Sequence, residues 1–376
     1  MSPLFVFSAD LHLEDGAWTS RPGIYGDAYC SFLQIVDYCL RERLPLILGG
    51  DILEKKQNLA RPIAQLCAGL DRMAAANVPV YYIQGNHEFD RNSAWLSVHA
   101  WPVHLHKKTI EIHGANDPRP VRIYGLDWLP RGDIQAALAE VPADTDILIT
   151  HQVWEDFMGK LGRTDCSLSD VHHVSTVLAG DFHVTKNVTA VNAQGKSVTM
   201  FSPGSTCMQD VSESPQKFIF QVNRSNGNPP FEVAPQTLLT RPFLSYAVKD
   251  QDVLDDLCAG QLVADIKAAT LAGPELIATP IVRIKFDPQL PDAYLRLMTA
   301  AGTAGHMFCE ALTEKTPKKA ATRSTGRNDI IAALDALLPV GSPAHKLAAA
   351  LVEAHDPVTE LDAQLAQFLQ AAQPAD

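Results

Sequence analysis

The sequence predicts an α/β fold in which short buried strands alternate with helices. Apolar runs at 4–9, 46–49 and 79–83 are short and aliphatic, which is typical of buried strands. The stretches between them, 27–43 and 59–76, have the character of helices, and the second has apolar residues at helical spacing. Alternation of strand and helix implies that these strands pair in parallel, with right-handed crossovers.

A second sheet is predicted from a series of shorter strands further along the chain. Their hairpin-like spacing favours a partly antiparallel sheet, and Gly195 marks a turn between two of them. These strands are expected near 109–113, 121–125, 146–150, 176–179, 186–192, 197–202 and 217–222. The segment 223–237 is rich in Asn, Gly and Pro, so we expect a linker there.

The remainder of the chain predicts a smaller unit and a tail. Strands near 243–249, 280–286 and 305–311, with helices near 251–259 and 291–301, form a small α/β unit. The predicted organisation is a first domain over 1–225, a small domain over 236–312, a basic linker over 313–327 and a helical segment over 328–372. With 376 residues, the chain is long enough for two or three domains.

The composition bears on three properties of the protein: binding to nucleic acid, insertion into membranes and the state of its cysteines. The formal net charge of −12 argues against binding nucleic acid by bulk charge, although bound divalent cations would add local positive charge. No run approaches the roughly 20 apolar residues of a membrane span, so we expect no membrane partner. The seven cysteines are scattered without a CxxC pair and no secretory signal is visible, which predicts reduced thiols in a cytoplasmic protein.

Polar clusters follow five of the predicted strands, at their carboxyl ends. Open α/β sheets place their ligands at this edge. The clusters are FSADLH with Asp10 and His12, ILGGD with Asp51, YIQGNHE with Asn86, His87 and Glu88, ILITHQ with His151, and VLAGDFH with Asp181 and His183. Seven of these side chains are oxygen or nitrogen donors that converge as a two-metal hydrolase requires.

The residue types indicate which metals the centre would take. Asp10 and His12 are two apart and can chelate one ion, and Asp51 can bridge two ions through its two oxygens. Mixed nitrogen and oxygen donors without cysteine suit Mn²⁺, Fe²⁺ or Zn²⁺. We expect His87 to contact the substrate phosphate or to protonate the leaving oxygen rather than bind metal. Glu88 is expected to hold the ring of His87 in orientation.

The order DxH, GD, GNHE, H and GxxH over roughly residues 4–206 resembles the calcineurin-like metallophosphoesterase superfamily. Within it, DLHL, the pair His151-Gln152 and the small domain that follows look most like SbcD-type nucleases of bacteria and phages. The resemblance implies a four-layer β-sandwich flanked by helices, with a small α/β capping domain that selects DNA and a helical C-terminal tail.

The family's site residues carry over to matching positions of this chain. The resemblance implies one metal held by Asp10, His12, Asp51 and His183, a second held by Asp51, Asn86, His151 and Asp181, and His87 as the catalytic residue. The family usually has GHxH where this chain has GDFH, so Asp181 is a departure. Its harder oxygen favours Mn²⁺ or Mg²⁺ over softer ions, or leaves the second site weak.

The resemblance implies a Mn²⁺-dependent DNA exonuclease and endonuclease with a two-metal mechanism in repair or recombination. It would be the nuclease subunit of a complex with an SbcC-type coiled-coil ATPase, docked through the helical tail, and a homodimer in the cytoplasm of a cell or of a phage host. Candidate contacts to DNA are Lys55, Lys56 and Arg91. The alternatives are a small-molecule phosphodiesterase or phosphatase, which the acidic charge suits, and a weakly active DNA-binding subunit.

Overall fold

The computed structural model describes most of the chain up to residue 312. The described residues are 2–13, 23–54, 60–89, 99–114, 119–159, 164–225, 227 and 230–312. The DNA contacts predicted at Lys55, Lys56 and Arg91, the basic linker 313–327 and the helical segment 328–372 therefore lie outside the described residues.

The first sheet has six strands in the order β12-β11-β1-β2-β3-β4. Its strands are β1 (Ser2–Ser8), β2 (Leu46–Gly49), β3 (Val80–Ile83), β4 (Val103–His104), β11 (Lys217–Arg224) and β12 (Phe231–Leu238). The strands β1 to β4 are parallel, as the alternation of strands and helices predicts. On the other side of β1, β11 and β12 pair antiparallel.

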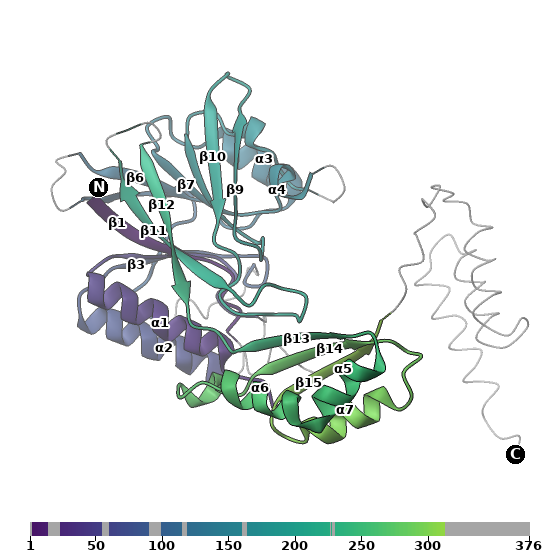
Figure 1. Ribbon diagram of the computed structural model, residues 1–376. Coiled ribbons are helices and arrows are strands. Elements are labelled where there is room, and N and C mark those ends of the chain that lie inside the picture. The colour runs from purple at the N-terminus through teal and green to yellow at the C-terminus, as the bar shows by residue number, and fades with distance from the viewer. Residues whose placement is uncertain are drawn as a thin grey trace, which may run out of the picture. The chain divides into compact units, whose positions relative to one another are not determined.

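Two amphipathic helices cover the outer face of the first sheet (Figure 1). They are α1 (Asp27–Glu42) and α2 (Ala60–Ala75). Phe32 and Val36 of α1 and Leu70 of α2 pack with Val6 and Leu48 of the sheet. Because helix residues four apart lie on one face, the apolar stripe of each helix meets the sheet while its polar face remains outside.

The second sheet also has six strands, in the order β5-β6-β7-β8-β10-β9. Its strands are β5 (Lys108–Ile112), β6 (Val121–Gly125), β7 (Ile147–His151), β8 (Thr176–Gly180), β9 (Lys186–Val191) and β10 (Ser197–Ser202). The pairs β5–β6 and β9–β10 are antiparallel and the others are parallel, so the predicted mixed sheet is confirmed. Helices α3 (Arg131–Ala139) and α4 (Glu155–Met158) pack on its outer face, and a turn of 3₁₀ helix spans Leu168–Asp170.

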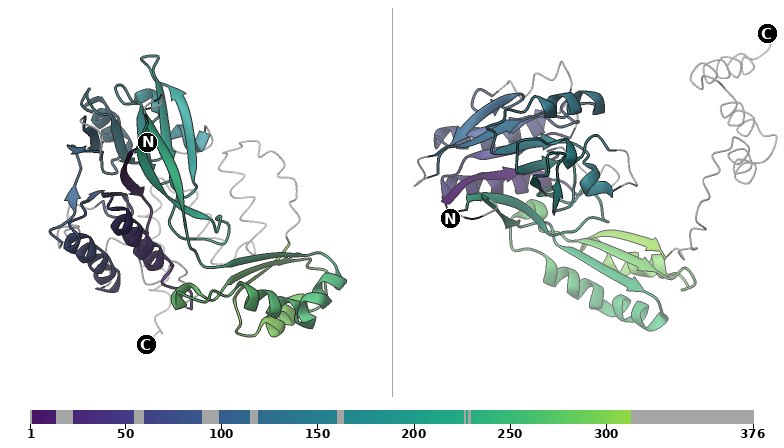
Figure 2. Two further views of the ribbon diagram at one scale, coloured as in Figure 1. Left: turned by 60° about the vertical axis from the view of Figure 1, so that its left-hand side comes forward. Right: turned by 90° about the horizontal axis from the view of Figure 1, so that it is seen from above.

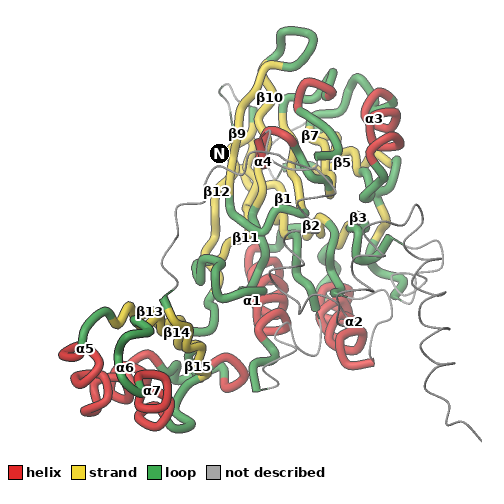
Figure 3. Tube along the Cα trace, turned by 90° about the vertical axis from the view of Figure 1, so that its right-hand side faces the viewer, coloured by secondary structure: helices red, strands yellow, loops and turns green. Residues whose placement is uncertain are grey.

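The two sheets face each other across a dry core, which makes four layers of helix, sheet, sheet and helix (Figure 3). Phe5 and Phe7 point into this inner core with Ile47, Ile149 and Leu178, whereas alternate residues of the same strands pack against the helices. Burial on both faces explains why the strands read as continuous apolar runs rather than as alternating ones. The predicted α/β sandwich is therefore confirmed.

A third, parallel sheet of three strands forms the small α/β unit (Figure 2). Its strands are β13 (Phe243–Val248), β14 (Ile281–Phe286) and β15 (His306–Ala311), and its helices are α5 (Gln251–Asp256), α6 (Leu262–Ala269) and α7 (Ala293–Ala301). The segment Leu257–Gln261 joins α5 to α6 with a kink at Gly260, where φ is 126°, and Glu275–Ile277 form a short 3₁₀ helix. The helices pack on one face of the sheet, around Leu254, Ile266 and Leu297.

Two expectations from the sequence were wrong at this end of the fold. The segment 217–222 does not join the second sheet, since β11 pairs with β1 of the first sheet. The second half of the predicted linker, from residue 231 on, is β12, which is paired along its whole length with β11. Its proline is tolerated because β12 is an edge strand, where a missing N–H need not break the ladder. The division into a first and a small domain stays a proposal.

Buried contacts join the third sheet to the helical layer of the first. The guanidinium of Arg241, which is nearly inaccessible, makes two 2.9 Å hydrogen bonds to the Asp27 carboxylate at the start of α1. It also donates to the backbone carbonyls of Tyr25, Leu276 and Thr279. None of the helices that the structure describes could cross a lipid bilayer.

Candidate metal centre

The predicted donors lie at the carboxyl ends of strands from both sheets. Asp10 and His12 follow β1, Asp51 follows β2, Asn86 and His87 follow β3, His151 ends β7, and Asp181 and His183 follow β8. The two sheets are stacked face to face, and their parallel strands end on the same side. All seven predicted ligands therefore converge, together with His87, as the sequence predicts.

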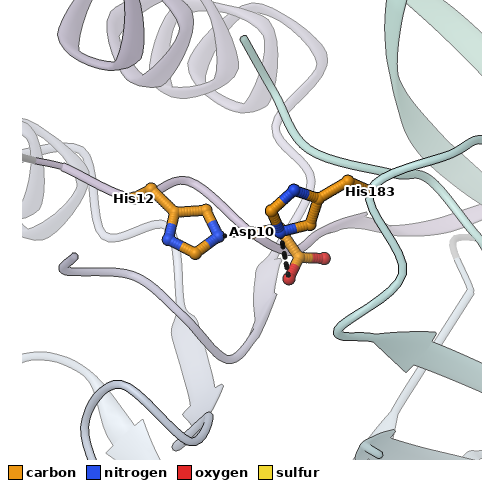
Figure 4. Close-up of side chains that lie close together, drawn as sticks. All are labelled: Asp10, His12 and His183. Atoms are coloured by element: carbon orange, nitrogen blue, oxygen red, sulfur yellow. Dashed lines mark hydrogen bonds and ion pairs between the residues drawn. The ribbon is translucent and has the colours of Figure 1, made fainter. Parts of the chain in front are cut away.

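Asp10, His12 and His183 form the first group of donors (Figure 4). The Nε2 atoms of the two histidines face each other at 3.1 Å, and Asp10 Oδ1 lies 4.0 Å from His183 Nε2. Asp51 Oδ2 approaches this group to 3.8 Å from His12 Nε2. The spacing allows one ion to be shared among four donors.

The second group is built around His151, which is completely buried. Its Nε2 lies 3.3 Å from Asp51 Oδ2, 3.6 Å from Asp181 Oδ1 and 3.9 Å from Asp10 Oδ1. Asp51 thus stands between the two groups, with one oxygen near both His12 and His151. This is the position of a carboxylate that bridges two ions.

The amide of Asn86 lies among the donors of the second group, where it could serve as a further ligand. Its Oδ1 lies 3.2 Å from both carboxylate oxygens of Asp51 and 3.3 Å from Asp181 Oδ1. Oxygen atoms at this separation repel one another unless positive charge lies between them. With the amide turned over, its nitrogen would donate hydrogen bonds to these oxygens; with its oxygen facing inward, the amide would be a ligand for a divalent cation.

Each histidine of the two groups presents Nε2 to the centre because its Nδ1 faces another partner. His151 Nδ1 bonds to the backbone carbonyl of Gly49 at 2.7 Å. His183 Nδ1 bonds to the Glu213 carboxylate at 3.3 Å. His12 Nδ1 lies 2.6 Å from Glu54 Oε2. Metal-binding histidines are held in this way, with the free lone pair on the opposite nitrogen.

The electrostatics of the centre also fit a cation. Burial raises the pKa of Asp181 to about 6, helped by the carboxylates of Asp10 and Asp51 and opposed by His151. Burial by itself would lower the pKa of His151, but the surrounding carboxylates raise it well above its ordinary value. Both shifts arise because carboxylates are crowded in a buried site, where a bound divalent cation would supply the compensating positive charge.

The backbone around the centre is strained. Asp10, His12, Asp51 and Asp181 have φ angles of 53°, 50°, 47° and 80°, in the left-handed region that side chains other than glycine rarely occupy. Each such residue costs of order 1–3 kcal/mol and persists only where surrounding structure fixes it. Four of them at one site indicate that the fold holds these donors in place for function.

His87 lies at the rim of the centre and is about one-third exposed. Its Nδ1 contacts the backbone carbonyl of Glu54, and its Nε2 lies 3.8 Å from Asp51 Oδ2. Burial tends to lower the pKa of His87, but the Asp51 carboxylate and the bond to Glu54 raise it overall. The geometry places His87 Nε2 beside the bridging carboxylate of Asp51, as the predicted role requires.

Glu88 was predicted to orient the His87 ring. The structure instead places the Glu54 backbone carbonyl against the Nδ1 of that ring. Glu88 is fully buried and accepts backbone hydrogen bonds at 2.8–2.9 Å from Gly85, Asp51 and Leu53. It therefore ties the loop after β3 to the loop after β2. Burial and the nearby Asp51 carboxylate raise its pKa to about 8.

Two carboxylates at the centre were missed by the sequence analysis. Glu54 contacts both His12 and His87, and its place three residues after Asp51 was a usable signal. Glu213 contacts His183 from the segment between β10 and β11, where no apolar run or turn motif pointed to it. Only the fold shows that this segment returns to the centre.

Comparisons with known proteins agree with this geometry. The profile of the calcineurin-like phosphoesterase family matches residues 3–185, which include every predicted ligand. The DNA double-strand break repair protein Mre11 of Haloferax volcanii is 27% identical over 146 residues, covering 37% of this chain and 32% of that protein. The protein of the same name from Methanosarcina mazei is 23% identical over 220 residues, covering 54% of this chain and 33% of its own length.

The chain spans about a third of the length of the curated relatives it matches. The family match, by contrast, runs from β1 to the loop after β8 and includes the strand ends that carry the donors. Residues 3–185 of this chain therefore form a calcineurin-like phosphoesterase domain.

Proposed function

We propose that this protein is a metal-dependent phosphodiesterase that cuts DNA as an exonuclease and endonuclease. The observation that carries the proposal is the close grouping of Asp10, Asp51 and His151, with Asp181 Oδ1 3.6 Å from His151 Nε2, which a bound cation would hold together. The family of residues 3–185 supports the hydrolytic chemistry, and the similarity to Mre11 proteins supports DNA as the substrate.

Two ions fit the donor set. Asp10, His12, Asp51 and His183 would hold one, and Asp51, Asn86, His151 and Asp181 would hold the other. Aspartate and amide oxygens predominate at the second position, so we expect Mn²⁺ there more than a soft ion, with Mg²⁺, Fe²⁺ and Zn²⁺ as the other candidates.

When bound, the ions would supply the Lewis acidity that draws a water and a phosphodiester together and offsets the charge of the transition state. Proton transfer and orientation would be the work of the side chains. His87 donates its Nδ1 proton to the Glu54 carbonyl, so Nε2 is the nitrogen that faces the centre and that takes up the second proton when the ring is charged. We propose that this Nε2 proton is passed to the leaving oxygen. Glu54 keeps the ring in that orientation.

The wider assignment follows the similarity to Mre11 proteins. We propose a nuclease subunit that works as a homodimer with an SbcC-type ATPase in repair or recombination. The unit over 236–312 would select DNA, the segment 328–372 would dock the ATPase, and Lys55, Lys56 and Arg91 would contact the backbone of DNA.

The test is cleavage of end-labelled duplex DNA, measured with Mn²⁺, Mg²⁺, Zn²⁺ or EDTA and beside a chromogenic phosphodiester. We expect DNA cleavage that requires Mn²⁺ and is lost in Asp51→Asn, since this change removes the shared carboxylate. A matched control is Asp37→Asn, an exposed aspartate on α1 that pairs with Arg72. This variant should cut as fast as the wild type.

Two results would replace the proposal. Mn²⁺-dependent hydrolysis of the small ester with no cleavage of DNA would make the protein a small-molecule phosphodiesterase. DNA binding with two bound ions and no hydrolysis of either substrate would make it a DNA-binding subunit.

A further inference from the structure

Lys217 is a buried lysine beside the metal centre, and the proposed chemistry does not use it. Only 3% of its side chain is exposed, although lysine is almost never fully buried without a partner. Its Nζ donates to Glu213 Oε2 at 2.6 Å and to Ser205 Oγ at 2.8 Å. The ammonium at the start of β11 is therefore directed at one carboxylate.

The two carboxylate oxygens of Glu213 contact different partners. Oε2 accepts from Lys217, from the Ser205 hydroxyl at 3.1 Å and from the backbone N–H of Gln209 at 3.3 Å. Oε1 meets His183 Nδ1 at 3.3 Å. Three donors on one oxygen fix the plane of the carboxylate, so the other oxygen is held toward the imidazole.

His183 needs such support more than the other histidines of the two groups. Its side chain is 34% exposed, whereas those of His151 and His12 are 0% and 3% exposed. Packing helps to fix the two buried rings, in addition to the partners of their Nδ1 atoms. The orientation of His183 depends on the hydrogen bond at its Nδ1 to Glu213.

We propose that Glu213 and Lys217 are positioning residues that orient His183 and strengthen its Nε2 as a donor. They would thereby set the affinity for the cation of the group Asp10, His12 and His183. An anionic acceptor on Nδ1–H makes the opposite nitrogen more basic, and losing such a partner typically weakens metal binding by about 10–100-fold. Lys217 contributes by keeping Glu213 charged and in place. The inference rests on the proposed function only in requiring that this group binds a cation.

The experiment is a titration of the metal-free full chain with Mn²⁺, with free ion followed by electron paramagnetic resonance. Glu213→Gln retains a carbonyl oxygen for His183 but loses the charge. We expect one of the two ions to bind about 10–100-fold more weakly than in the wild type, with the other unchanged. The control is Glu140→Gln, which removes the same charge from an exposed pair with Lys107 at 2.9 Å. It should bind both ions as the wild type does.

A second variant guards against misfolding, because Glu213→Gln leaves the Lys217 ammonium buried without its anion. Glu213→Gln/Lys217→Met removes both charges and should unfold at a denaturant concentration near that of the wild type. We expect the double variant to lose as much affinity for one Mn²⁺ ion as Glu213→Gln does, since both residues act through His183. Wild-type affinity for both ions in this folded double variant would overturn the inference.

The outcomes separate this inference from the proposed function. A wild-type chain that binds two Mn²⁺ ions but does not cut DNA contradicts the nuclease proposal. The Mn²⁺ affinities of the variants would still test the role of Glu213. A wild-type chain that binds no divalent cation overturns both.

Discussion

Gly180 is a residue whose substitution would disturb the centre directly without removing a donor. It ends β8, immediately before Asp181, and its Cα faces the hydrogen bond between His151 Nδ1 and the Gly49 carbonyl. A Cβ at this position would lie 2.5 Å from each of these two atoms. Ordinary contact requires about 3.5 Å, so both atoms must move apart by roughly 1 Å.

These contacts allow the loss in free energy of unfolding of Gly180→Ala to be worked out. Neither atom can yield easily, because one is backbone and the other belongs to a fully buried ring. Overpacking costs about 1–3 kcal/mol and the lost hydrogen bond about 1 kcal/mol, so Gly180→Ala should lower the free energy of unfolding by roughly 2–4 kcal/mol. Because His151 loses its orienting partner, affinity for one Mn²⁺ ion should fall at least about 10-fold.

Urea unfolding of the metal-free protein and a Mn²⁺ titration measure the two effects. Gly132→Ala is the matched control, since a Cβ there, in the first turn of α3, meets nothing within 4 Å. We expect this control to be neutral or more stable by up to about 1 kcal/mol. If Gly180→Ala unfolds like the wild type and binds Mn²⁺ equally well, the close packing behind His151 is refuted.

Three further changes test other parts of the structure. Asp181→Ala should reduce the number of bound Mn²⁺ ions from two to one, counted by elemental analysis after dialysis; an unchanged count would exclude Asp181 as a ligand. His87→Ala should keep both ions while DNA turnover falls about 10²–10⁴-fold, and undiminished turnover would refute its role as proton donor. Arg241→Ala should lower the free energy of unfolding by about 3–5 kcal/mol in urea, since Asp27 is left buried without its partner; a loss below about 1 kcal/mol would contradict this.

The first sheet and the donors could be predicted because each parallel strand is buried on both faces. Val6 packs against the helices while Phe5 and Phe7 fill the inner core, so residues 4–7 of the strand are an unbroken apolar run. A polar residue directly after such a strand is then conspicuous. Asp10, Asp51 and Asp181 were found in this way, without any knowledge of the distances between them.

What could not be predicted depends on contacts between segments far apart in the chain. β11 follows the second sheet in sequence but pairs with β1, because the chain returns to the first sheet after β10. The same return brings Glu213 and Lys217 to His183. Such long-range contacts leave no periodic pattern in the sequence. The histidines could therefore be predicted, but the groups that accept hydrogen bonds from their Nδ1 atoms could not.

The ion positions test the central claim most directly. The measurement is an anomalous difference map from crystals of the wild-type chain grown with Mn²⁺. We predict two peaks, one contacted by His12 and His183 and the other by Asn86 and His151, with Asp51 touching both. A map with no peak among these residues, while Mn²⁺ binds elsewhere on the protein, would contradict the two-metal centre.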